Sequence, residues 1–327
     1  MTAVNQEKEL ILAEPRGFCA GVDRAIEIVE RALIAFGAPV YVRHEIVHNT
    51  YVVNTLREKG AIFIEDLDDV PAGATLVFSA HGVSKAIQQE AERRGFRIFD
   101  ATCPLVRKVH VEVSKLHQEG YDFVMIGHKG HPEVEGTMGQ LDEGIYLVDS
   151  LEDVARLVLP QIEKLAVVTQ TTLSVDDAAM IMAALKKRFP TIREPKKQDI
   201  CYATQNRQDA VKSLSELVEV VIVVGSPTSS NSNRLCEVAR RQGTPGYMVD
   251  SADELKPEWF QGVAKVGLTA GASAPELLVK QVIERMRDFG YYKLSHMQGI
   301  EEKIQFPLPK GLRLDDGPLY SELRNGR

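Results

Sequence analysis

Three of the four cysteines, Cys19, Cys103 and Cys201, each precede a helix-like segment, and the same succession of elements follows each one. A polar loop comes 28 or 29 residues after the cysteine, an acidic residue at a strand end 46 to 49 residues after it, and a second polar loop 62 to 72 residues after it. The residues at these positions are His48, His131 and Ser229, then Asp66, Asp149 and Asp250, then His81, Thr171 and Ser273. This repetition predicts one unit written three times around a pseudo-threefold axis, with three thiols at its centre.

The chain alternates short β-branched runs with helix-period segments. The strand-like runs cover 10–14, 39–45, 75–80, 96–101, 122–128, 165–170, 220–226 and 263–270, and the clearest helices cover 22–36, 104–120, 175–189 and 274–289. The runs are apolar on both faces, which is typical of parallel strands covered by helices. The fold class is therefore α/β, and ligands are expected in loops at the carboxyl ends of the strands.

The repeat predicts three α/β domains at 1–103, 104–200 and 201–290. The strand expected at 9–14 precedes the first repeat and is free to pack against another one. Residues 291–327 lack clear periodicity, so we predict an extended or partly ordered C-terminal tail.

Composition excludes several classes of protein. The net charge of −7 over 327 residues argues against a broad nucleic-acid surface, although a local patch for a small anion remains allowed. No apolar run approaches the roughly 20 residues of a membrane span, and the start lacks a signal-peptide layout. Four cysteines make no disulfide framework in a chain of this size, and free thiols fit a reducing compartment. We expect a cytoplasmic globular protein that contacts neither nucleic acid nor membrane.

The three repeated cysteines are candidate metal ligands. None belongs to a CxxC pair, which excludes a zinc ribbon and a thioredoxin-type dithiol. A helix N-terminus lowers a thiol pKa and favours an anionic sulfur ligand. Three such ends suit an iron–sulfur cluster with a fourth corner free for chemistry; zinc held by three cysteines and one histidine is the rival site. Free cysteines are also commonly small buried hydrophobes, and this interpretation suits Cys236 in the amphipathic segment RLCEVARR.

The loops at the predicted strand ends carry imidazoles, hydroxyls and amides, which suit a phosphate or diphosphate. The candidates are His48, His81, His131, Thr171, Thr172, Ser229, Ser230, Asn231 and Ser273. Helix capping alone explains about half of the Ser, Thr and Asn residues but not the three histidines. No Walker A or GxGxxG sequence is present, so an ordinary nucleotide loop is not supported.

Glu133 follows His131 and Pro132, and it is the only acid in the loops expected to face the centre. A carboxyl group there could deliver the proton that turns a leaving hydroxide into water. The alternative is that Glu133 caps the helix that begins near Val134.

Nine motifs resemble those of the 4-hydroxy-3-methylbut-2-enyl diphosphate reductases, the last enzymes of the methylerythritol phosphate route to isoprenoids. They are PRGFCAGVDRA, YVRHEIVHN, FSAHGV, DATCPLV, GHPEVEGTMGQ, TQTTLSVDD, DICYATQNRQ, GSPTSSNSNRL and TAGASAP. The resemblance runs from about residue 10 to 289 and implies three α/β domains in a trefoil around a central iron–sulfur cluster.

The resemblance also implies residue roles. Cys19, Cys103 and Cys201 would hold one 4Fe–4S cluster whose fourth iron is open, and Glu133 would be the proton donor. His48, His81 and His131 match diphosphate-pocket histidines, and Thr171 matches a neighbour of the substrate hydroxyl. Further pocket-lining matches are Thr172, Ser229, Ser230, Asn231 and Ser273.

The implied reaction is reductive dehydroxylation to isopentenyl and dimethylallyl diphosphates. The electrons would come from ferredoxin or flavodoxin, because the chain has no nicotinamide or flavin motif.

Two other classes compete at this stage. A non-redox hydro-lyase would use the iron only as a Lewis acid and would need no electron donor. A zinc- or cluster-bearing binding protein would keep the cysteines but would need no acid at Glu133.

Overall fold

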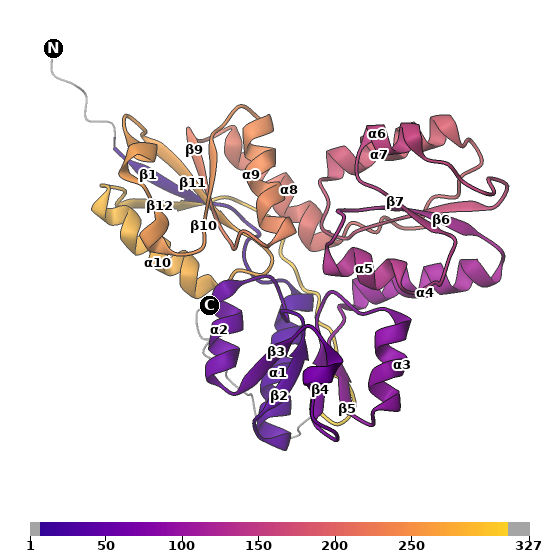
Figure 1. The fold of residues 1–327 in the computed structure, drawn as a ribbon. Coiled ribbons are helices and arrows are strands. Elements are labelled where there is room, and N and C mark those ends of the chain that lie inside the picture. Colours follow the sequence, from indigo (N-terminus) through magenta and orange to yellow (C-terminus); the bar gives the residue numbers. More distant parts are fainter. Residues whose placement is uncertain (1–6, 313–327) are drawn as a thin grey trace, which may run out of the picture.

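The computed structural model describes residues 7–312 of the chain, which form three α/β units that meet at a common centre (Figure 1). The first unit contains a parallel sheet with the order β3-β2-β4-β5. Its strands are β2 (Val40–Arg43), β3 (Ala61–Ile64), β4 (Thr75–Phe78) and β5 (Arg97–Asp100). Its helices are α1 (Ala20–Phe36), α2 (Thr50–Glu58), the 3-10 turn η1 (Leu67–Asp69) and α3 (Lys85–Arg93).

The second unit has three parallel strands in the order β7-β6-β8. They are β6 (Asp122–Ile126), β7 (Ile145–Val148) and β8 (Leu165–Thr169). The helices are α4 (Pro104–Gln118), α5 (Pro132–Met138), α6 (Leu151–Arg156) and α7 (Val175–Arg188).

The third unit contains a five-stranded parallel sheet with the order β10-β9-β11-β1-β12. The strands are β1 (Glu9–Leu12), β9 (Val220–Val224), β10 (Gly246–Val249), β11 (Lys265–Ala270) and β12 (Lys293–His296). The helices are α8 (Tyr202–Ser215), α9 (Ser230–Arg241), α10 (Glu276–Asp288) and the short turns η2 (Ala252–Glu254) and η3 (Pro257–Phe260).

The three sheets share one topology. In each unit the first strand lies between the second and the third, in the triplets β3-β2-β4, β7-β6-β8 and β10-β9-β11. Their pairs are all parallel, as the apolar runs predicted. The expected α/β trefoil is therefore confirmed.

The sheets are buried on both faces. In β9, all five residues of VVIVV are buried, and alternate residues contribute to two different apolar clusters on opposite sides of the sheet. Burial on both faces explains why the strand is continuously apolar instead of alternating.

The N-terminal strand β1 lies in the sheet of the third unit, between β11 and β12, and not in the unit that follows it in sequence. The strand β12 falls within the segment that the sequence predicts as a tail. Its sequence, KLSH, is short and mostly exposed, so no apolar period announces it. Residues 313–327 of that predicted tail lie outside the described residues.

After β12 the chain crosses from the third unit to the first, as the yellow segment of Figure 1 shows. Residues 297–312, which we call the strap, contact both units. The strap carbonyls of Pro307 and Leu312 accept hydrogen bonds from Arg24 and Arg31 of α1, at 2.8 and 3.4 Å. Leu312 is fully buried in the core of the first unit. The strap therefore fastens the first unit to the third.

The strap also neutralises a buried charge near the centre. The Arg207 side chain is completely buried and pairs with Glu302 of the strap at 3.0 Å. The same guanidinium donates to the carbonyls of Gly17 and Ala203, at 2.7 and 2.9 Å. These carbonyls lie two residues from Cys19 and Cys201 in sequence, so Arg207 orders two of the three cysteine segments.

No helix among residues 7–312 is long and apolar enough to cross a membrane.

We expect Glu302→Gln to lower stability by about 3 kcal/mol, because breaking a buried ion pair leaves an uncompensated charge. Thermal unfolding followed by circular dichroism measures this effect as a lower Tm. Glu301→Gln is the matched control, because Glu301 is exposed and pairs with the exposed Lys303. Equal Tm values for the two variants would show that Arg207 does not depend on the strap.

Candidate functional site

Each of the three repeated cysteines is the N-cap of a helix, at the starts of α1, α4 and α8. Each cysteine amide donates to a carbonyl of the loop that follows the third strand of a unit. The three bonds are Cys103 to Ala80 at 2.9 Å, Cys201 to Thr171 at 3.1 Å and Cys19 to Ala272 at 3.2 Å. The loops after β4, β8 and β11 therefore hold the three cysteines in a cyclic order.

The thiols converge on the first turn of α1. A Cβ atom added to Gly21 would lie 2.7 Å from Sγ of Cys103 and 3.8 Å from Sγ of Cys19. Glycine is needed here because any side chain would collide with the thiol that the second unit contributes. Cys201 lies in the same group, because an ionised Cys201 raises the pKa of Cys103 and an ionised Cys19 raises the pKa of Cys201.

The thiols fit a thiolate-ligated metal group. Burial raises the pKa of Cys103 to about 12 and that of Cys201 to about 11, and it also raises the pKa of Cys19. Backbone amides at the helix starts oppose this rise in pKa. They are those of Gly21 and Val22 for Cys19, Leu105 and Val106 for Cys103, and Thr204 for Cys201. Those N–H groups would stabilise sulfur anions once a cation displaces the thiol protons.

Cys236 does not belong to this group. It is buried in α9 among the apolar residues of the third unit, where it packs as a small hydrophobe.

Glu133 is buried beside the thiols and contacts Thr171. The Thr171 amide and hydroxyl donate to the two carboxyl oxygens, at 2.6 and 2.9 Å. Burial raises the pKa of Glu133 to about 7, against the opposing effect of these hydrogen bonds. The N-cap of α5 is His131, whose Nδ1 accepts from the Glu133 amide at 3.1 Å. The Glu133 carboxyl group is therefore aimed at Thr171 and does not cap the helix.

His48, His81 and His131 lie together although they come from two units. The rings of His48 and His81 are stacked at a centroid distance of 4.1 Å, and His131 lies 5.4 and 5.8 Å from them. Desolvation lowers the pKa of His131 to about 3 and that of His81 well below its usual value. These two imidazoles are neutral at pH 7, so they offer one N–H donor and one lone pair each.

Gln170, which the sequence analysis did not single out, joins the second unit to the third. Its amide nitrogen donates to Thr172 at 2.9 Å and to Ser230 at 3.4 Å, and its oxygen accepts from the His128 amide at 2.9 Å. The sequence could have indicated Gln170 through its position in TQTTLS, directly before the predicted site residues Thr171 and Thr172.

Ser273 joins the third unit to the first, and Asn231 orders the loop that contacts Cys19. The Ser273 hydroxyl donates to the His48 carbonyl at 2.9 Å and contacts Ser229 at 3.4 Å. The Asn231 side chain accepts from the Ala272 amide at 2.8 Å, in the loop that holds Cys19. Loops of all three units are thus hydrogen-bonded to one another around the thiols.

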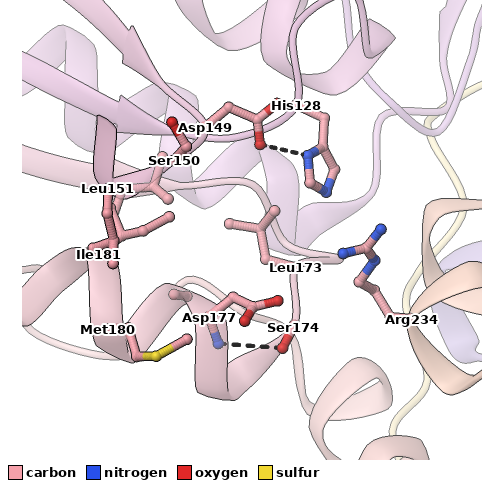
Figure 2. Close-up of a pocket in the computed structure, with 12 residues that line it drawn as sticks. His128, Asp149, Ser150, Leu151, Leu173, Ser174, Asp177, Met180, Ile181 and Arg234 are labelled. Atoms are coloured by element: carbon pink, nitrogen blue, oxygen red, sulfur yellow. Dashed lines mark hydrogen bonds and ion pairs between the residues drawn. The ribbon is translucent and has the colours of Figure 1, made fainter. Parts of the chain in front are cut away.

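His128 lies in the loop after β6 but faces a different space. Its Nδ1 contacts Asp149 at 2.7 Å, on the wall of a cavity of about 260 Å³ between the second unit and Arg234 of α9 (Figure 2). Charged and apolar side chains line this cavity, but none of the repeated cysteines and not Glu133. The chemistry therefore belongs to the central group of residues and not to this cavity.

The central site combines three thiols, one buried acid with a pKa of about 7 and a set of uncharged hydrogen-bonding groups. Such a site can hold a thiolate-bound metal group, bind a polyanion and transfer a proton.

Comparisons with known proteins were consistent in sequence and in structure. The profile of the LytB protein family matches residues 10–287. A 4-hydroxy-3-methylbut-2-enyl diphosphate reductase of Polaromonas sp. is 74% identical over 96% of this chain and 94% of its own. The reductase of the same name from Methylibium petroleiphilum is 73% identical over 93% of this chain and 92% of its own.

Two solved structures are similar. The E-1-hydroxy-2-methyl-but-2-enyl-4-diphosphate reductase from Plasmodium falciparum superposes with a TM-score of 0.91 at 42% identity, over 94% of this chain and 97% of that one. An (E)-4-hydroxy-3-methyl-but-2-enyl diphosphate reductase, described as the terminal enzyme of the non-mevalonate pathway, superposes with a TM-score of 0.63 at 34% identity. The latter match covers 86% of this chain and 99% of that one.

We expect the Glu133 carboxyl group to titrate with a midpoint near pH 7, measured as the protonated carboxyl band in infrared difference spectra. Glu133→Gln should remove this band. Thr171→Val should shift the midpoint upward, because the Thr171 hydroxyl lowers the pKa of Glu133 and valine lacks this donor. A midpoint near pH 4.5 in the unsubstituted protein would contradict the buried placement of this side chain.

Proposed function

The chain belongs to the LytB protein family, and on that premise we propose that its three clustered cysteines hold the metal group of a reductase site. The protein is an oxidoreductase that reduces 4-hydroxy-3-methylbut-2-enyl diphosphate in the terminal step of the non-mevalonate pathway. Replacing a hydroxyl group by hydrogen consumes two electrons and two protons. One proton leaves with the hydroxyl as water, and the other ends on carbon, giving isopentenyl and dimethylallyl diphosphates.

We assign one 4Fe–4S cluster to Cys19, Cys103 and Cys201. When bound, the cluster supplies single electrons and, at an iron without a cysteine ligand, a Lewis acid for the substrate hydroxyl. Support for this assignment comes from the N-cap positions, the helix-start amides and the approach of the Cys19 and Cys103 thiols to Gly21. The protein's own role is to order these thiols, chiefly through the loop carbonyls and Arg207.

We assign proton delivery to Glu133, with Thr171 as the relay. With a pKa of about 7, Glu133 is partly protonated at neutral pH. The Thr171 hydroxyl donates to ionised Glu133 at 2.9 Å. When Glu133 is protonated, the direction can reverse, so that Glu133 donates to Thr171 and the threonine proton passes to the leaving hydroxyl.

We assign the diphosphate to the uncharged groups around the centre. Neutral His131 accepts the Glu133 amide at Nδ1, so its proton lies on Nε2 and can be donated to a phosphate oxygen. The other assigned contacts are His48, His81, Thr172, Ser229, Ser230, Asn231 and Ser273.

The two electrons require an external donor, for which we propose ferredoxin or flavodoxin. We also propose a cytoplasmic location, because all four cysteines are free and an iron–sulfur site needs reduced thiols.

The single observation that carries the proposal is the meeting of three thiols from helix N-cap positions beside a buried acid. Anaerobically prepared protein should absorb broadly in the visible range and contain iron and sulfide. Cys103→Ser should lose both features, whereas Cys236→Ser, a control at a packed cysteine outside the site, should keep them. A colourless protein with one tightly bound zinc would contradict the cofactor assignment.

Glu133→Gln tests the proton donor, because glutamine keeps the shape of the side chain but has no carboxyl proton. Steady-state turnover with a chemical reductant should fall by about a hundred- to ten-thousand-fold. Visible absorption and substrate binding should be retained. In the unsubstituted enzyme, turnover should decline as pH rises through about 7, because the protonated fraction of Glu133 falls. Full turnover by the variant would assign the proton to another group.

A further inference from the structure

A compact group of imidazoles lies at the edge of the site, within the first unit alone. His44 and His48 come from the loop between β2 and α2, and His81 comes from the loop after β4. One ring nitrogen from each lies within 4.8 Å of the other two. No assigned role includes His44, and its presence turns a pair of stacked rings into a triad.

The Nδ1 atom of each ring already has an oxygen partner. The contacts are His44 Nδ1 to Glu65 at 2.8 Å, His48 Nδ1 to Glu45 at 3.0 Å and His81 Nδ1 to Ser79 at 3.2 Å. Metal-bound histidines in proteins almost always show this arrangement, in which an outer carboxylate or other oxygen orients the ring. The Nε2 atom of each ring is then the one that remains for a ligand.

The tautomers separate this triad from His131. A carboxylate can only accept, so the proton of a neutral His44 or His48 lies on Nδ1 and Nε2 presents a lone pair. His131 is reversed, because its Nδ1 accepts an amide and its proton lies on Nε2. A lone pair can ligate a cation directly, and the same Nε2 atom donates to a phosphate oxygen when the ring carries a second proton, so the two ligands are alternatives at His48. The Nε2 atom of His48 is moreover buried, and it has no hydrogen-bond partner among residues 7–312.

From this geometry we propose that His44, His48 and His81 bind one divalent transition-metal ion of the zinc class. Imidazole nitrogen is a preferred ligand of such ions, and three protein ligands leave a position for water or an anion. His44 is held for this role by a left-handed backbone, with φ of 63°, and by Glu65. The ion would compete with the diphosphate head group for His48 and His81; this competition, but not the metal site itself, rests on the proposed function.

The experiment uses anaerobic protein with its cysteine-bound metal group in place. Zinc is supplied from a chelator buffer that fixes its free concentration, and bound zinc, iron and visible absorption are measured together. We expect one zinc ion per chain with no loss of iron. His44→Asn should weaken zinc binding by at least about tenfold, and asparagine tolerates the left-handed backbone.

Glu65→Gln keeps the test valid if His44→Asn misfolds, because Glu65 is exposed and lies outside the triad. Loss of an outer partner should weaken zinc binding by about 10- to 100-fold. His117→Asn, on an exposed position of α4, is the matched control and should bind zinc normally.

Two results would overturn the metal site. One is equal zinc affinity in His44→Asn, Glu65→Gln and the control; the other is zinc uptake only as iron is lost, which would assign the zinc to the thiols.

At fixed free zinc, we expect the apparent KM for substrate to rise with kcat unchanged. Zinc that binds the triad but leaves KM unchanged would support the metal site and overturn the diphosphate assignment of His48 and His81.

Discussion

The site depends on three backbone hydrogen bonds, each from a cysteine amide to the loop after the third strand of a unit. The order is cyclic: the first unit holds Cys103, the second holds Cys201 and the third holds Cys19. No unit can therefore build the centre alone. The placement of β1 beside β11 follows from the same cycle, because the segment before Cys19 must leave the third sheet just as β5 leaves the first toward Cys103.

This cyclic arrangement places polar groups where water is scarce, and the hydrogen bonds between units satisfy them. Gln170 and Ser273 each join loops of different units, and Arg207 donates to carbonyls two residues from two of the cysteines while Glu302 compensates its charge. Such a network is stabilising only when its members are paired, since unpaired buried polar groups are costly. The low dielectric of the centre also explains why Glu133 is still partly protonated near neutral pH, which is the property that proton delivery requires.

The histidines show how one residue type serves different ligands through its outer partners. His131 accepts a hydrogen bond from an amide and can donate from Nε2 toward the centre, whereas His44 and His48 face carboxylates and, when neutral, present a lone pair at Nε2. Residue type alone cannot distinguish an anion pocket from a cation site in such a cluster. The outer partner of each ring bears on that distinction, because an amide or a carboxylate at Nδ1 fixes the tautomer and orients the ring.

The sequence by itself determined the α/β class, the threefold repetition and the grouping of cysteines with polar loops, because strand burial and helix starts leave local, periodic signals. It also singled out Glu133, but left open whether the carboxyl group caps a helix; only the contact with Thr171 decided that. The tertiary structure alone placed β1 in the third sheet, formed β12 and aimed His128 at a separate cavity. It alone revealed the Arg207–Glu302 pair and the imidazole triad. These features join residues up to hundreds of positions apart or depend on which ring nitrogen is engaged, and neither property leaves a local pattern in a chain.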